Sequence, residues 1–118
     1  MALTYTVHIK TVDIDSNSRA FQLVSEFFKR GNNVQLVMTD EGVQWAKNHS
    51  GYLDQLNSEG ITPYTYFADL LHEDVEILVL DTSADYHGIG RNDVVPNASL
   101  VSITELVSFM EETTIIPV

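Results

Sequence analysis

Side chains with catalytic potential gather after the apolar run VEILVL at residues 75–80. Asp81, Ser83 and His87 follow this run directly, with Asp85 among them. A histidine beside a carboxylate can serve as a general base, and a serine within its reach can act as a nucleophile. This pattern makes Asp81, Ser83 and His87 the catalytic candidates of a small acid/base hydrolase. The alternative interpretation is a set of solvated polar groups without a catalytic role.

A second polar cluster, Asp13-Ile14-Asp15-Ser16-Asn17, copies the opening of a calcium-binding loop. Ser18 stands where that loop needs a glycine, and Val24 stands where it needs a bidentate acid. We therefore interpret the cluster as a strand-to-helix turn. Its short polar side chains would accept hydrogen bonds from free amide groups at the start of the helix.

The sequence lacks the patterns of common metal and cofactor sites. It has no cysteine, which excludes disulfides, thiolate metal sites and cysteine nucleophiles. Gly88-Ile89-Gly90 lacks the third glycine of a dinucleotide-binding fingerprint and does not open a helix. The four histidines lack the i, i+4 spacing of a helical zinc site; they are His8, His49, His72 and His87. We predict neither a metal site nor a cofactor.

The charge of the chain is strongly negative and unevenly placed. Its 118 residues include 17 acidic and 6 basic ones, for a net charge of −11. Residues 1–47 are neutral, whereas residues 48–118 carry the whole deficit and only one basic residue, Arg91. Such a surface repels phosphate backbones and anionic lipids, so we expect no nucleic-acid or membrane partner. With no signal peptide or long apolar run, we expect a soluble cytoplasmic protein.

Hydrophobic periodicity predicts strands that alternate with helices along one domain, residues 1–118. Strands are predicted at residues 5–12, 34–38, 75–80, 98–101 and 113–116. Helices are predicted at residues 19–30, 41–48, 51–59, 63–73 and from 103 onward, with a long polar loop at 81–97. This alternation implies an α/β fold: a mostly parallel sheet of about five strands flanked by helices on both faces, because each crossover is long and right-handed.

Capping patterns predict where the first and last helices begin. Ser18 is expected to cap the first helix and Gly31 to end it. Ser102 and Glu105 have the spacing of a capping box and open the last helix. That helix is expected to bury four apolar side chains: Ile103, Leu106, Val107 and Met110.

Parallel sheets of this kind bind ligands beyond the carboxyl ends of their strands, at a point where the strand order reverses. Three predicted segments leave such ends, at residues 13–17, 39–42 and 81–92. The residues expected to bind a ligand there are Asp13, Asn17, Thr39, Asp40, Asp81, Ser83 and His87.

In order and spacing, nearly the whole chain resembles the DsrE/DsrF-like superfamily, in particular its YedF-related branch. The resemblance rests on VQLVMTDEGVQWA at 34–46, VEILVLDTSADYHGI at 75–89 and NDVVPNASLVSITELVSFM at 92–110. It implies a single DsrE-like domain and a homo-oligomer, a dimer or a trimer. Proteins of this superfamily relay sulfur, and the branch carries Cys-Gly-Thr-Cys at the end of the strand that corresponds to residues 75–80.

The resemblance places the two family cysteines on Leu80 and Ser83, and a one-residue shift would move the first to Asp81. A persulfide relay needs a thiolate, which neither leucine, aspartate nor serine supplies. The resemblance therefore predicts the fold and argues against sulfurtransferase activity.

Three functional hypotheses follow from these residues. The leading one is a non-catalytic binding or assembly subunit, related to sulfur-relay proteins and with a possible protein partner. The second is the acid/base hydrolase described above. The third is a sensor of a small ligand or metal, which would bring together the loop acids Asp13, Asp15, Asp40, Glu41 and Asp81.

Overall fold

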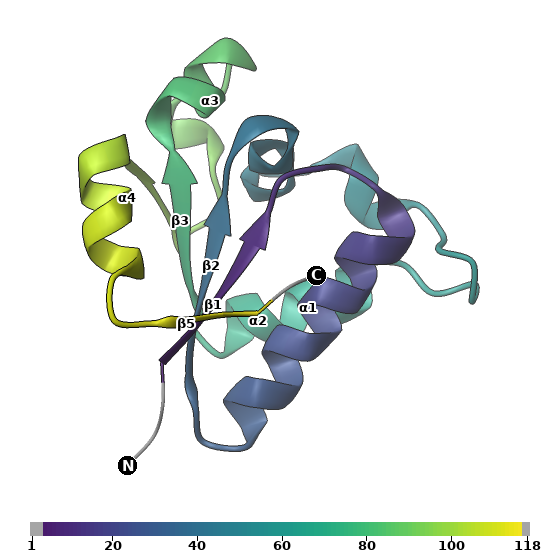
Figure 1. Cartoon of the computed structure of the whole chain (residues 1–118). Helices are drawn as coiled ribbons and strands as arrows, with labels where there is room; N and C mark the ends of the chain where they lie inside the picture. Colours follow the sequence, from purple (N-terminus) through teal and green to yellow (C-terminus); the bar gives the residue numbers. More distant parts are fainter. Residues whose placement is uncertain (1–3, 117–118) are drawn as a thin grey trace.

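Five parallel strands form one sheet in the computed structural model, which describes residues 4–116 (Figure 1). The strand order is β4-β3-β2-β1-β5. The strands are β1 (Thr4–Ile9), β2 (Asn33–Met38), β3 (Glu76–Leu80), β4 (Ala98–Val101) and β5 (Thr114–Ile116). Helices lie on both faces, so the predicted α/β architecture is confirmed.

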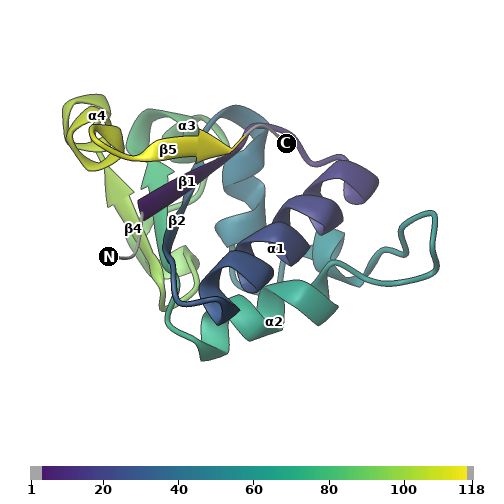
Figure 2. The same cartoon turned by 60° about the horizontal axis from the view of Figure 1, so that its bottom comes forward.

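The helices divide unequally between the two faces of the sheet. α1 (Ile14–Lys29) and α2 (Tyr64–His72) lie side by side on one face, whereas α4 (Ile103–Met110) lies on the other (Figure 2). The remaining helical segments are α3 (Asp81–Tyr86) and the 3-10 turns η1 (Asp40–Ala46), η2 (Gly51–Asp54) and η3 (Arg91–Asp93). None of the described helices has the length and apolar composition needed to cross a membrane.

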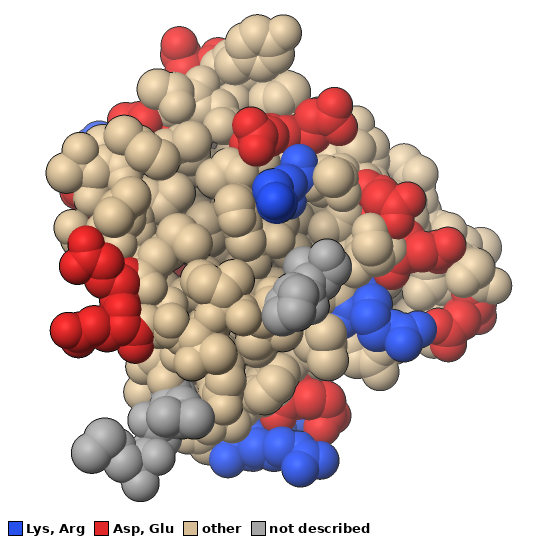
Figure 3. All heavy atoms as spheres, in the orientation of Figure 1, with Lys and Arg blue, Asp and Glu red and all other residues tan. Residues whose placement is uncertain are grey.

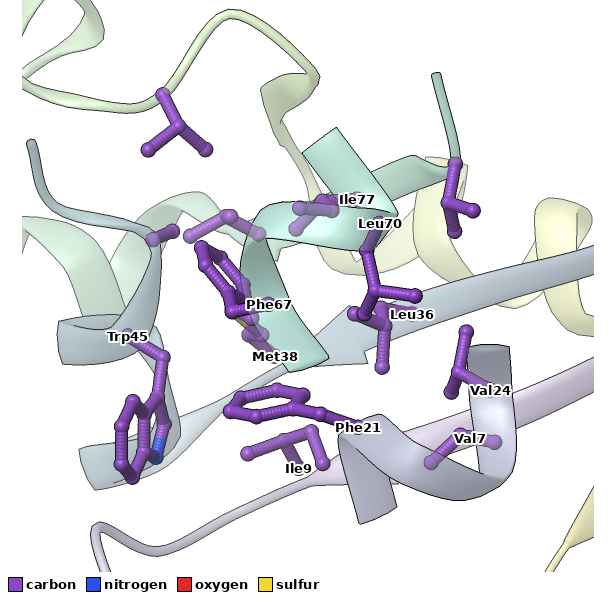
Figure 4. Close-up of a cluster of buried hydrophobic side chains, with 14 of the residues drawn as sticks. Val7, Ile9, Phe21, Val24, Leu36, Met38, Trp45, Phe67, Leu70 and Ile77 are labelled. Carbon is purple, nitrogen blue, oxygen red and sulfur yellow. The ribbon is translucent and has the colours of Figure 1, made fainter. Parts of the chain in front are cut away.

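The face covered by α1 and α2 contains the larger core (Figure 4). Phe21 lies at its centre, with its ring centroid 5.2 Å from that of Trp45 and 5.0 Å from that of Phe67. All three rings are fully buried, and Leu36 and Ile77 of the sheet belong to the same cluster. Each such side chain contributes about 1.5–3 kcal/mol through burial, so this face supplies most of the hydrophobic stabilisation.

The face covered by α4 has a smaller core that contains polar groups. Its apolar cluster consists of Val37, Leu78, Val101 and Leu106. Beside this cluster the buried Gln35 side-chain amide donates to Thr6 Oγ1 at 2.9 Å and to the Phe109 carbonyl at 2.8 Å. These bonds satisfy the two side-chain N–H groups of Gln35 and connect the end of α4 to β1 and β2.

Several predicted elements have the expected extent. α2, β4 and α4 agree with their predicted positions, and Gly31 ends α1 in a left-handed conformation with φ +86°. The start of α1 was predicted wrongly: the helix begins at Ile14 rather than at residue 19. Asp13, not Ser18, caps it, because the Asp13 carboxylate accepts the Ser16 N–H at 2.9 Å.

Two other predictions require correction. The helix predicted at 51–59 is confined to η2, because the Asn57 side-chain oxygen accepts the N–H groups of Glu59 and Ile61, both at 2.9 Å, and forms a turn. The polar loop predicted at 81–97 instead begins with α3, which starts immediately after β3. This helix gives the residues after β3 fixed positions.

Candidate functional site

The carboxyl ends of β1, β2 and β3 lie next to one another at one edge of the sheet. The strand register pairs Ile9 with Met38, and Met38 with Val79. The segments that follow these strands therefore start at the same level. This confirms that the three predicted loop regions leave adjacent strand ends.

A close backbone approach fixes the segment after β2. The Thr39 N–H donates to the Ile9 carbonyl at 3.1 Å, and a Cβ atom added at Gly42 would lie only 2.3 Å from that carbonyl oxygen. Only glycine fits such an approach. The contact packs η1 against the end of β1 and places Asp40 and Glu41 beside α3.

A cavity of about 330 Å³ lies between the first turn of η1 and α3. Its volume is at the lower end of the range usual for small-molecule sites. The cavity is lined by Asp40, Glu41, Thr82, Ser83, Tyr86 and His87. It contains three of the residues predicted to bind a ligand, Asp40, Ser83 and His87, and a fourth, Thr39, lies directly before them.

A hydrogen-bond chain orients the Asp40 carboxylate. The Thr39 hydroxyl donates to Asp40 Oδ2 at 3.1 Å, and His8 Nε2 lies 2.7 Å from the same hydroxyl oxygen. When Thr39 donates its single proton to Asp40, its oxygen can only accept from His8 Nε2, which then carries the proton of the imidazole. The pKa of His8 is lowered, mainly by burial and then by the charge of Lys10. The Asp40 carboxylate opposes this shift but does not reverse it.

Ser83 connects the end of β2 to α3. Its hydroxyl oxygen accepts the backbone N–H of Asp40 at 2.9 Å. Asp40 has a left-handed backbone with φ 54°, a conformation that costs a residue other than glycine of the order of 1 kcal/mol. The Ser83 bond compensates for part of this cost and holds the Asp40 main chain in place.

The three catalytic candidates are not joined to one another by side-chain hydrogen bonds in the described residues. No hydrogen bond joins the Ser83 hydroxyl to the His87 ring among residues 4–116, and His87 packs instead edge-on against Tyr86, with centroids 5.2 Å apart. Asp81 lines a different cavity of about 450 Å³, together with Asp85. Ser83, His87 and Asp81 are therefore near one another in sequence without being coupled.

Asp13 and Asn17 lie outside the cavity beside α3. Asp13 caps α1, and hydrogen bonds from Ser16 lower the pKa of its carboxyl. The buried Asn17 amide donates to the carbonyls of Thr11 and Asp13 at 3.0 and 2.6 Å. Asn17 also lines a cavity of about 150 Å³ at the end of β1. That end adjoins the reversal of strand order between β1 and β5, whereas the cavity of about 330 Å³ follows β2 and β3.

The acidic residues considered for a metal sensor do not converge. Asp15 accepts the Ser58 N–H at 2.6 Å, on the outer side of α1. Only Asp40 and Glu41 share a cavity. In the part of the chain that the structure describes, no three His, Cys, Asp or Glu side chains form a group able to hold a metal ion.

Sequence reasoning did not single out two residues of the cavity, Thr82 and Tyr86, and considered His8 only as a zinc ligand. α3 places Tyr86 at the cavity, and the sequence signal was there: Tyr86 directly precedes His87 in a segment wrongly predicted to be a loop. His8 could be found only from its alternation in β1, which directs it to the face opposite Val7 and Ile9.

Comparisons with known proteins identify the fold. The structure of the YchN protein of Escherichia coli superimposes with a TM-score of 0.73 and 14% sequence identity, covering 98% of this chain and 100% of YchN. MTH1491 of Methanobacterium thermoautotrophicum, a protein of unknown function, has a TM-score of 0.62 and 17% identity, covering 97% of each chain. The chain has a DsrE-like fold.

Sequence comparison is less informative about the family than structural comparison is about the fold. No family model matches the chain. A curated protein of Sulfolobus acidocaldarius, named only "Protein", is 32% identical over 117 residues, which include 90% of this chain. The chain spans 40% of the length of that relative.

Of the two positions that the resemblance assigns to thiols, Ser83 lines the cavity and Leu80 does not. Leu80 is the last residue of β3 and is partly buried. Ser83 lies in the first turn of α3 and lines the cavity. The Ser83 hydroxyl oxygen already accepts a hydrogen bond from the Asp40 N–H.

Proposed function

We propose that this chain is a non-catalytic DsrE-like subunit, which binds a ligand or partner and does not carry sulfur. The observation that carries the proposal is the Ser83 hydroxyl, which stands at one of the two positions where the resemblance expects a thiol and accepts the Asp40 N–H at 2.9 Å. A serine hydroxyl does not ionise near neutral pH without a strong base and does not accept sulfane sulfur. The cavity remains, but its side chains are suited to binding rather than to sulfur transfer.

Assembly into a dimer or trimer is part of the proposal. Four large apolar side chains near the end of the chain are 43–59% exposed: Ile103, Val107, Phe109 and Ile115. They belong to α4 and β5, which are neighbours in sequence. In the view of Figure 3, which has the orientation of Figure 1, residues other than Lys, Arg, Asp and Glu fill most of the centre of the surface. Ile103 and Val107 lie one turn apart on the same face of α4, and neighbouring apolar side chains exposed in this way are typical of a subunit or protein interface.

Mass spectrometry after incubation with inorganic polysulfide tests the absence of sulfur transfer. We expect no adduct on the wild-type chain, because no thiolate is present to accept sulfur. The variant Ser83→Cys should gain one sulfur atom, which shows that the donor reaches the cavity. Ser108→Cys, at an exposed position of α4, controls for the general reactivity of a surface thiol.

A stable gain of one sulfur atom by the wild-type chain would contradict the proposal. Sedimentation of the same preparation tests assembly. A monomer at all concentrations would contradict the part of the proposal that predicts a homo-oligomer. The two measurements are independent, because the first depends on residues beside β3 and the second on α4 and β5.

A further inference from the structure

The cavity beside α3 offers hydrogen-bond acceptors with negative charge. Asp40 and Glu41 line one side of it, and both residues are exposed. No Lys, Arg or His nitrogen lies within 4.0 Å of either carboxylate among residues 4–116, where the ion pairs are Arg19–Glu59 and Arg30–Glu26. Asp40 Oδ2 accepts one hydrogen bond from Thr39, whereas the Glu41 carboxylate makes none with the described residues. The chemistry of this side calls for a cationic hydrogen-bond donor.

The opposite side of the cavity contains an exposed aromatic ring. Tyr86 is 86% exposed, the highest value among the large apolar side chains of the described residues. It comes from the last turn of α3, and the His87 ring packs against it at a centroid distance of 5.2 Å. The contact with His87 leaves most of the surface of the Tyr86 ring open to a ligand.

The cavity is also held in shape before any ligand arrives. The Ser83 hydroxyl fixes the Asp40 main chain, Thr39 orients the Asp40 carboxylate, and the contact of Gly42 with β1 fixes the start of η1. A site that needs little reorganisation loses less free energy on binding. The second cavity beside α3 differs from it because its lining includes no aromatic residue. That cavity is lined by Asp81, Thr82, Asp85, Ile89, Gly90 and Leu100.

We propose that the cavity between η1 and α3 binds a guanidinium group. A guanidinium ion is planar, permanently charged and rich in N–H donors, so it can donate to the Glu41 and Asp40 carboxylates while its face stacks on Tyr86. A bare metal ion fits less well, because no group of three metal-ligating side chains is present in the described residues. This inference rests on the proposed binding function and specifies its ligand chemistry.

The guanidinium group could come from a small molecule or from an arginine side chain of a partner protein. Two probe pairs distinguish these sources. The first pair is butylguanidinium and its neutral analogue butylurea; the second is the peptide acetyl-Gly-Arg-Gly-amide and the same peptide with citrulline in place of arginine. Each pair differs in charge and in little else.

Amide chemical shifts of the nitrogen-15-labelled protein at low ionic strength measure binding. We expect butylguanidinium to shift the amide signals of residues 40–41 and 82–87, and butylurea to leave them unchanged. If the arginine peptide binds at least tenfold more tightly than butylguanidinium, the source is a protein side chain; if the two bind alike, a free small molecule suffices. Either result supports a guanidinium site.

Three exposed positions provide matched variants. Glu41→Gln should weaken butylguanidinium binding about tenfold, the value of one charge-assisted hydrogen bond of about 1.4 kcal/mol. Tyr86→Leu should weaken it several-fold by removing the ring face. Asp85→Asn makes the same charge change as Glu41→Gln in the second cavity and should leave the affinity unchanged. Thermal melts confirm that each variant folds.

Two results would overturn the inference: equal shifts with butylguanidinium and butylurea, or equal losses of affinity in Glu41→Gln and Asp85→Asn. The first would mean that the cation is not recognised, and the second that only the overall negative charge attracts it. Failure of guanidinium binding would leave the sulfur-transfer experiment unaffected, so the two proposals fail separately.

Discussion

The two faces of the sheet differ in what covers them and in what they bury. One face packs against two helices, and the rings of Phe21, Trp45 and Phe67 are fully buried there. The other packs against the single helix α4, buries the polar residues Thr6 and Gln35, and leaves Ile103 and Val107 59% and 50% exposed. The first face is complete within one chain, whereas the second is only partly covered.

The difference indicates separate roles for the two faces. Aromatic packing on the α1 side supplies the stability that lets the chain fold. The hydrogen bonds of Gln35 and Thr6 on the α4 side specify one position of α4 without adding much apolar burial. Four predictions test this division, beginning with the largest expected loss of stability.

Replacement of Phe21 by alanine should cause the largest loss. Its ring contacts Trp45 and Phe67 and is fully buried, so Phe21→Ala leaves a cavity at the centre of the core. We expect a decrease of about 3–5 kcal/mol in the free energy of unfolding, measured by urea denaturation. Phe21→Leu, which keeps most of the volume, should lose clearly less. Equal losses for both variants would contradict the central role of the aromatic cluster.

Replacement of Leu106 by alanine should have a smaller effect. Leu106 is the buried residue of α4 and packs on Val37, Leu78 and Val101. We expect a loss of about 2–3 kcal/mol, at the lower end for leucine, because α4 borders on solvent and the site can collapse. The same urea titration measures it. A loss larger than that of Phe21→Ala would reverse the proposed order of the two faces.

The sequence predicted the fold well where pattern and packing agree. The alternation of strands and helices, the capping box at Ser102 and the glycine stop at Gly31 are local signals, and all three are present in the structure. The prediction that α4 buries Ile103 and Val107 was wrong, because the period of a helix shows which side chains are apolar but not how wide a surface covers them.

The cavity could be predicted only in part. The rule that ligands bind beyond strand ends led to Asp40, Ser83 and His87, which do lie together. The same rule could not show that Asp81 faces the other side of α3, or that His8 reaches Asp40 through Thr39. These relations depend on the start of α3 and on strand register, which hydrogen bonds between distant residues determine.

The pH dependence of stability should change in His8→Gln, a variant on the α4 face. Burial and Lys10 keep the pKa of His8 below 6.5, so the unfolded chain binds a proton more readily there than the folded one. Stability is therefore full above about pH 6.5 and falls as the pH drops below it. Glutamine retains an N–H donor for Thr39 without titrating. The urea midpoint of His8→Gln should therefore depend less on pH between 7.5 and 5.5 than that of the wild type.

Two nearby charges act on this equilibrium, Lys10 lowering the pKa of His8 and Asp40 raising it. The other groups with shifted pKa values, the carboxyls of Asp13 and Glu105, respond in a more acidic range and do not contribute in this window. The same slope of stability against pH in wild type and His8→Gln would contradict a half-buried, neutral His8.

The smallest effect on the stability of one chain, and the sharpest test of the uncovered face, is expected from Ile103→Ser combined with Val107→Ser. At least half of each side chain is exposed, so each change should alter the free energy of unfolding of the isolated chain by about 0.5 kcal/mol or less. If the exposed residues of α4 form a subunit interface, the same pair should shift the oligomer to monomer in analytical ultracentrifugation. Thr104→Ala with Ser108→Ala changes the polar stripe of the same helix at the same spacing and should leave assembly intact. An oligomer that survives the serine pair would place the interface elsewhere, and the exposed side of α4 would then have to be explained by a different protein partner.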